Sequence, residues 1–213
     1  MKDNVFFVSG IDTNVGKSYA TGYLAKTWNE QGVRTITQKF IQTGNVGMSE
    51  DIELHRKIMG TGLLPEDESG LTMPEIFTYP CSPHLAAEID HRPIDFDKIE
   101  KATHQLSETY DAVLLEGAGG LMVPLTRDLL TIDYVAQKNY PLIFVTSGKL
   151  GSINHTLLSL EAVIRRGIRL HTVAYNLFPE EDDDIIRRDT EAYIRDLLAK
   201  EYPETHFVVI PKL

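Results

Sequence analysis

The chain has 213 residues, of which 42% are hydrophobic and 24% charged. This composition is typical of one globular α/β domain with a full core, and we expect no disorder. Its net charge of -10 argues against binding duplex nucleic acid or an anionic membrane, because both need clustered Lys and Arg. The single cysteine, Cys81, excludes an internal disulfide and zinc sites built on several cysteines. Since the chain also has no signal peptide and no membrane-spanning apolar run, we expect a single domain over residues 1–213 in the cytoplasm.

Six apolar runs predict the strands of a sheet. Five of them are β-branched and aromatic and apolar on both faces, as in strands buried on both sides of a parallel sheet; the run at 35–37 is weaker. In chain order the runs are residues 5–8, 35–37, 112–115, 142–145, 172–175 and 207–210.

Helical spacing follows most of these runs. The first stripe contains Ala20, Leu24 and Trp28, and Gly32 is placed to end that helix. The second stripe follows Asp95, a candidate N-cap, and contains Ile99, Ala102, Leu106 and Tyr110. The third contains Ile153, Leu157, Leu160 and Ile164 and is closed by Gly167. The fourth contains Ile186, Tyr193 and Leu197. Alternation of strands and helices predicts a parallel sheet covered by helices on both faces, in three layers. Ligands of such sheets bind at the carboxyl ends of the strands.

A glycine-containing loop follows the first strand. Gly10 and Gly16 flank it, and Lys17 and Ser18 open the next helix. In this order, backbone N–H groups and the helix N-terminus can hold the phosphates of a nucleoside triphosphate, the lysine can reach the outer phosphates, and the hydroxyl can bind Mg²⁺. Five residues separate the two glycines, where the usual phosphate loop has four.

Other polar side chains follow the remaining strands. Glu116 ends the run at 112–115 and precedes a glycine-rich turn, where an acid resembles the second metal-coordinating residue of P-loop enzymes. Lys39 ends the weak strand, and Asp51 opens a helical segment. A lysine at that edge could stabilise charge on a transferring phosphoryl group, but taken alone Lys39 is better explained as a surface lysine. Asp51 taken alone could be an N-cap or a first-turn acid, which helices favour. The segment 149–155 begins a helix whose free N–H groups could hold a carboxylate, or it is an ordinary strand-to-helix turn.

These segments together resemble the dethiobiotin synthetase family over nearly the whole chain. The strongest matches are residues 10–18, 116–120 and 149–155, with support from 82–84 and 210–213. The phosphate loop of that family has the five-residue spacing. The resemblance implies a P-loop NTPase-like fold and a homodimer. It also implies a reaction in which 7,8-diaminononanoate, CO₂ and ATP give dethiobiotin, ADP and phosphate, through a carbamate and a carbamic-phosphoric anhydride.

The resemblance also assigns roles to matching positions. Lys39, Lys17 and Thr13 would act around the transferring phosphoryl group. Mg²⁺ would be held by Ser18, Asp51 and Glu116. Thr43 would touch the diamine or its carbamate, and the helix start formed by Gly151, Ser152, Ile153 and Asn154 would receive the substrate carboxylate across the dimer interface. The ATP-binding set would comprise Asn14, Val15, Gly16, Lys17, Ser18, Tyr19, Asp51, Glu116, Gly117, Ala118, Gly119, Asn176, Leu177, Pro211, Lys212 and Leu213.

Three positions depart from the family pattern, and other functions compete. Asn14 stands where an acid is frequent, Ser18 where threonine is frequent, and Thr43 where serine is common. One competing function is a synthetase of the cobyrinic acid kind. Another is a partitioning or septum-positioning ATPase, although those switches usually carry an extra lysine early in the loop, where this chain has residues 11–13 without one. An inactive paralogue is opposed by the retained lysines and acids.

Overall fold

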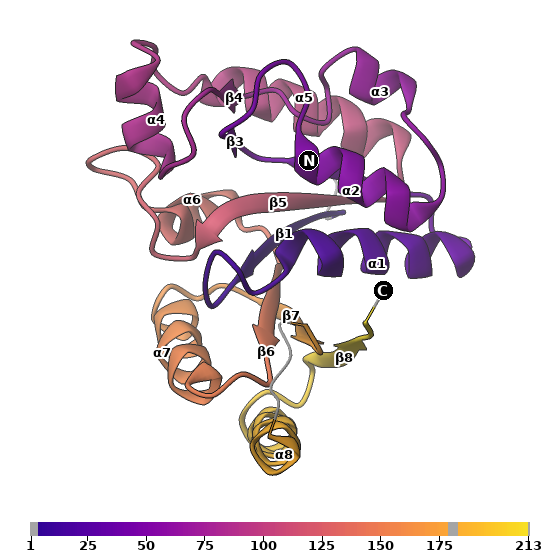
Figure 1. The fold of residues 1–213 in the computed structure, drawn as a ribbon, viewed down its shortest axis with the longest axis vertical. Helices are drawn as coiled ribbons and strands as arrows, with labels where there is room; N and C mark the ends of the chain where they lie inside the picture. The colour runs from indigo at the N-terminus through magenta and orange to yellow at the C-terminus, as the bar shows by residue number, and fades with distance from the viewer. Residues whose placement is uncertain (1–3, 179–182, 213) are drawn as a thin grey trace.

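A computed structural model describes residues 4–178 and 183–212. Its main sheet has six parallel strands in the order β2-β5-β1-β6-β7-β8 (Figure 1). The strands are β1 (Val5–Gly10), β2 (Thr35–Lys39), β5 (Ala112–Gly120), β6 (Leu142–Ser147), β7 (Leu170–Asn176) and β8 (His206–Ile210). All six predicted strands are therefore confirmed, including the weak one, and the parallel direction is as predicted.

Helices cover both faces of this sheet. Val8 of β1 points into a cluster with Ala20 and Leu24, whereas Phe7 points into a second, larger cluster on the other face. This alternation explains why the runs are apolar on both faces. The helix on the first side is α1 (Lys17–Glu30). Those on the second side are α5 (Phe96–Thr109), α6 (Thr131–Lys138), α7 (Ser152–Arg165) and α8 (Asp184–Glu201).

Local signals set the ends of several helices. Asp95 accepts a hydrogen bond from the N–H of Lys98 at 2.9 Å, which confirms it as the N-cap of α5. Gly32 has φ 86° directly after the last turn of α1, in the left-handed region that favours glycine.

An insertion between β2 and α5 contains elements that the sequence pattern did not predict, apart from the helix at Asp51. They are β3 (Gln42–Thr43), α2 (Glu50–Met59), α3 (Pro65–Glu68), β4 (Ile76–Phe77) and α4 (Pro83–Ile89). Strands β3 and β4 pair in parallel as a separate two-stranded sheet. In Figure 1 the insertion lies beside β5, while α7 and α8 lie at the other end, around β6, β7 and β8.

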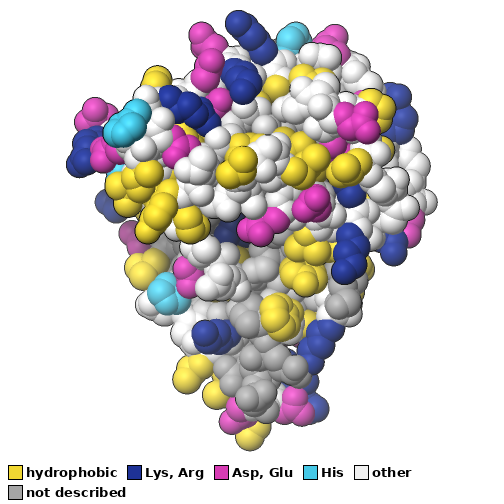
Figure 2. Space-filling view, turned by 45° about the horizontal axis from the view of Figure 1, so that its top comes forward, with side chains coloured by type: hydrophobic (Ala, Val, Ile, Leu, Met, Phe, Trp, Pro, Cys, Tyr) yellow, Lys and Arg dark blue, Asp and Glu magenta, His cyan; other side chains and the backbone are white. Residues whose placement is uncertain are grey.

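Charged side chains of both signs intermingle on the face shown in Figure 2, and apolar side chains gather in a band across its middle. Among the residues that the structure describes, no helix combines the length and the hydropathy needed to cross a bilayer.

Candidate active site

The loop between β1 and α1 is held tightly against its surroundings. Gly16 has φ 81°, and a Cβ atom there would lie 2.1 Å from the side-chain nitrogen of Asn176. At Gly10 a Cβ atom would lie 2.6 Å from Val15. Both glycines are thus required by the conformation of the loop itself, in agreement with its predicted role of wrapping a phosphate.

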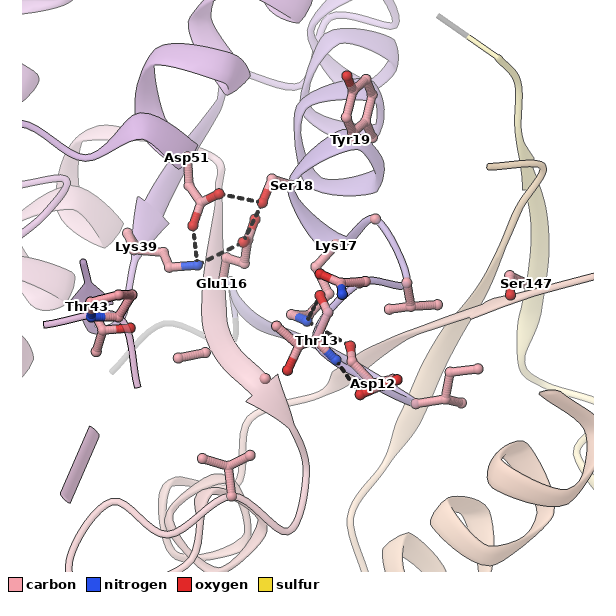
Figure 3. Close-up of a pocket in the computed structure, with 18 of the residues that line it drawn as sticks. Asp12, Thr13, Lys17, Ser18, Tyr19, Lys39, Thr43, Asp51, Glu116 and Ser147 are labelled. Carbon is pink, nitrogen blue, oxygen red and sulfur yellow. Dashed lines mark hydrogen bonds and ion pairs between the residues drawn. The ribbon is translucent and has the colours of Figure 1, made fainter. Parts of the chain in front are cut away.

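Lys17 closes this loop from inside. Its Nζ donates to the backbone oxygens of Asp12 at 2.9 Å and Thr13 at 3.1 Å (Figure 3). The side chain is buried, and burial lowers its pKa to about 8, although the nearby charge of Glu116 opposes that shift. The ammonium therefore lies at the centre of the loop, where outer phosphates of a nucleotide would need a cation.

Four polar side chains from four elements converge beside the loop. The Nζ of Lys39 contacts a carboxylate oxygen of Asp51 and lies 2.9 Å from Oε1 of Glu116. Ser18 Oγ donates to Asp51 at 2.6 Å or to Glu116 Oε1 at 2.9 Å. These contacts, drawn as dashed lines in Figure 3, join α1, β2, α2 and β5. The predicted lysine and the three predicted metal ligands are thus neighbours.

Strand register explains half of this convergence. Lys39 and Glu116 are direct partners in the pairing of β2 with β5, so their side chains leave the same edge on the same face. Asp51 arrives on the first turn of α2, where the N-cap Ser49 accepts the N–H of Ile52 at 3.2 Å. The Ser49 hydroxyl also donates to Gln42 of β3 at 2.6 Å, which ties the helix start to the small sheet.

The buried charges in this cluster stabilise one another. Burial opposes the ionised form of Glu116, but Lys39 and His55 outweigh it and hold the pKa of this carboxyl well below its usual range. Burial likewise opposes the ammonium of Lys39, yet Glu116 and Asp51 raise its pKa. The site therefore favours a charged Lys39 beside an ionised Glu116.

His55 and Arg56 are part of the site's support and were missed in the sequence. His55 Nε2 lies 2.8 Å from Glu116 Oε2, and both side chains have no exposed surface. The available signal was the spacing: His55 follows Asp51 by four residues, one turn along the same face of α2. Because Arg is mostly exposed in proteins and His is intermediate, nothing in the local pattern indicated that both would be buried here.

A cavity of about 1010 Å³ opens in front of these groups. Thr13 and Thr43 line it together with Lys17 and Lys39, as the predicted roles require. Cys81 also lines it. The remaining predicted residues among the lining are Asn14, Val15, Gly16, Ser18, Tyr19, Asp51, Glu116, Ala118, Gly119 and Ser152.

Several other predicted site residues do not line this cavity. Asn176 is buried, and its amide nitrogen donates to the backbone oxygen of Val15 at 2.9 Å, so it supports the phosphate loop. At Gly117 a Cβ atom would lie 2.9 Å from the ring of Phe7, so this glycine permits close packing beneath the site. Leu177, Pro211 and Lys212, predicted near adenine, and Gly151, Ile153 and Asn154, predicted for the substrate carboxylate, are also outside the lining, and Leu213 lies outside the described residues.

The comparisons with known proteins agree with this geometry. A family described as "AAA domain" matches residues 4–213. The chain is 53% identical over 206 residues to ATP-dependent dethiobiotin synthetase BioD 2 of Pasteurella multocida (strain Pm70), covering 97% of this chain and 96% of that protein. It is 57% identical over 184 residues to the protein of the same name from Haemophilus influenzae, covering 86% of this chain and 96% of that protein.

Solved structures with low sequence identity share the fold. Chloroplast FtsY from Physcomitrella patens superposes with a TM-score of 0.54 at 14% identity, over all of this chain and 60% of that one. A ParA family ATPase from Chlorobium tepidum superposes with a TM-score of 0.54 at 12% identity, over 99% of this chain and 85% of that one. These similarities confirm the predicted P-loop NTPase-like fold and carry no conclusion about a switch function.

The identity to the two synthetases over most of the chain decides the family, and this chain belongs to the ATP-dependent dethiobiotin synthetases.

Proposed function

We propose that the cavity in front of Lys17 and Lys39 is where this enzyme uses ATP to activate a carbamate of 7,8-diaminononanoate and close the ureido ring of dethiobiotin. The observation that carries this assignment is the convergence of Lys39, Asp51, Glu116 and Ser18 beside the phosphate loop. Phosphoryl transfer depends mainly on positioning and on positive charge at the phosphoryl group, and two buried lysines supply that charge. Residues 1–213 would act as one catalytic domain.

The proposed reaction has three balanced steps. One amine of the substrate adds to CO₂ and loses a proton, which gives a carbamate. A carbamate oxygen then attacks the γ-phosphorus of ATP, and the bond to the bridging oxygen breaks to release ADP. The second amine attacks the carbonyl carbon of the resulting anhydride, expels phosphate and loses its proton as the ring closes. Lys39 would balance the charge on the carbamate and on the phosphoryl group, with Thr13 and Thr43 beside them.

The cluster fits a bound Mg²⁺ by the chemistry of its donors. Asp51, Glu116 and Ser18 supply two carboxylates and a hydroxyl, and each carboxylate lies within hydrogen-bond distance of that hydroxyl. Mg²⁺ is usually bound by one or two carboxylates together with phosphate oxygens and water, and this set of donors matches that pattern. When bound, the ion would neutralise charge on the ATP phosphates.

The substrate carboxylate is proposed to bind at the start of α7, in a homodimer. Ser152 supports this assignment because it is buried at the helix start, 3.1 Å from the hydroxyl of Ser147 at the end of β6, and lines the cavity. Leu150, Leu158 and Ile164 are exposed apolar side chains along the same segment, as a surface covered by a second copy would be. Light scattering of the purified chain tests the dimer. A cytoplasmic location remains part of this proposal, supported by the dependence on ATP.

The decisive experiment measures phosphate release with Mg²⁺-ATP and bicarbonate, with and without the diamine, while dethiobiotin is followed by mass. Diamine-dependent phosphate release matched by dethiobiotin is expected. Lys39→Ala should abolish the product, and Lys101→Ala on an exposed face of α5 serves as a matched control. Full dethiobiotin formation by Lys39→Ala would refute the assignment of Lys39.

A further inference from the structure

The carboxylate of Glu116 is held from two opposite sides. Its Oε1 atom faces Ser18 and Lys39, at 2.9 Å from each of their polar atoms. Its Oε2 atom faces away from that cluster toward His55, 2.8 Å from Nε2. Because an ionised carboxylate only accepts hydrogen bonds, Nε2 must carry the hydrogen and donate it. His55 is therefore the donor and Glu116 the acceptor of this hydrogen bond.

His55 is itself fixed by a buried chain of polar groups. Its Nδ1 lies 3.0 Å from the hydroxyl of Thr37, and Arg56 donates to the same hydroxyl at 2.8 Å. Arg56 is anchored by two hydrogen bonds of 2.8 Å to the carboxylate of Asp67, at the end of α3. The imidazole therefore has both nitrogens engaged and little freedom to turn.

This chain of groups links two of the proposed metal ligands through one helix. Asp51 lies on the first turn of α2, and His55 lies one turn further along the same face. One helix thus carries a proposed ligand and also the group that orients the other ligand, Glu116 on β5. Without His55, Oε2 would be a buried acceptor with no partner, and the carboxylate would be driven to rotate.

We propose that His55 is a positioning residue, which holds Oε2 of Glu116 so that Oε1 is presented toward Ser18 and the phosphate loop, and thereby sets the affinity for Mg²⁺ in the complex with ATP. This inference rests on the proposed role of Glu116 in the Mg²⁺ site. Groups that hold a metal ligand from behind typically change metal affinity by about 10–100-fold when removed. His55 itself contacts neither nucleotide nor substrate in this assignment.

The test compares His55→Phe, which keeps a ring without a donor, with His55→Gln, whose amide can still donate near the position of Nε2. Mg²⁺ binding to the full chain saturated with ATP is measured by titration calorimetry, and ATP binding is measured separately in EDTA. We expect His55→Phe to weaken Mg²⁺ binding about 10–100-fold, His55→Gln to recover most of it, and ATP binding in EDTA to stay unchanged in both. His104→Gln, on an exposed face of α5, is the matched control and should bind like wild type.

Three outcomes would overturn the inference: wild-type Mg²⁺ binding by His55→Phe, an equal loss in both His55 variants, or a loss of ATP binding in EDTA. If His55→Phe does not fold, Thr37→Val and Thr37→Ser replace it. The valine removes the hydroxyl that fixes Nδ1 and should bind Mg²⁺ more weakly than the serine, and equal binding would again overturn the inference. Glu116→Gln separates the two proposals, because unchanged Mg²⁺ binding in that variant would refute the metal site itself.

Discussion

Removing the carboxylate of Asp67 should lower the melting temperature of the whole chain. The side chains of Asp67 and Arg56 are 0% and 2% exposed, and two hydrogen bonds join them. Asp67 also accepts from the Thr72 hydroxyl at 2.6 Å and from the N–H of Leu64 at 2.8 Å. Asp67→Ala leaves a buried guanidinium without its partner, a change that costs about 3–5 kcal/mol.

That cost converts into a measurable change in melting temperature. For a chain of 213 residues, an unfolding entropy of roughly 2.1 cal/mol/K per residue gives about 2 °C per kcal/mol, so Tm should fall by about 7–11 °C. Thermal unfolding followed by circular dichroism at pH 7 measures it. The control is Asp196→Ala on an exposed face of α8, which should change Tm by no more than about 1 °C. If Tm falls by less than about 3 °C in Asp67→Ala, the buried ion pair does not stabilise the fold as argued here.

Three further predictions concern the loop and the pH response. Gly16→Ala should abolish ATP binding measured by calorimetry, because the added Cβ atom would lie 2.1 Å from the side-chain nitrogen of Asn176. The control is Gly32→Ala, where φ is 86° but nothing lies within 4 Å of the added atom. This variant should bind ATP normally and lose only about 1 kcal/mol of stability. Because burial lowers the pKa of Lys17 to about 8, kcat/KM for ATP should fall as pH rises above that value. Arginine stays charged over this range, so an identical fall in Lys17→Arg would contradict deprotonation of Lys17 as the cause. Burial, together with His206 and Arg169, lowers the pKa of His171 below 6.5, so the unfolded chain takes up this proton first and the unfolding free energy should decrease as pH falls below 6.5; in urea titrations at pH 7.5 and 5.5, His171→Phe should show a smaller decrease than wild type.

The parts of the fold that the sequence predicted are those governed by local chemistry. Runs buried on both faces are recognisable because every residue in them is apolar, as in β6 (Leu142–Ser147). The cap at Asp95 and the turn at Gly32 also need only their own neighbours. The insertion was predicted poorly because β3 and β4 have two residues each and α3 has four, too short for either periodicity to appear.

The buried polar network escaped prediction for a different reason. Arg56 and Asp67 are eleven residues apart and belong to residue types that are almost always exposed. Their burial depends on the partners that the insertion brings together, Thr37 of β2 among them. No pattern within one segment contains that information.

The sequence by itself determined the phosphate loop, the chain order of the six main strands and of helices α1, α5, α7 and α8, and the candidate residues at the strand ends, because these follow from glycine conformations, apolar periodicity and the residue types. Tertiary structure decided which candidates meet. Pairing of β2 with β5 sets Lys39 beside Glu116, and the packing of α2 brings Asp51 to them and His55 behind them. The physical reason is that opposite charges taken out of water are stable only when they find one another, and only the packed sheet and helices fix that pairing.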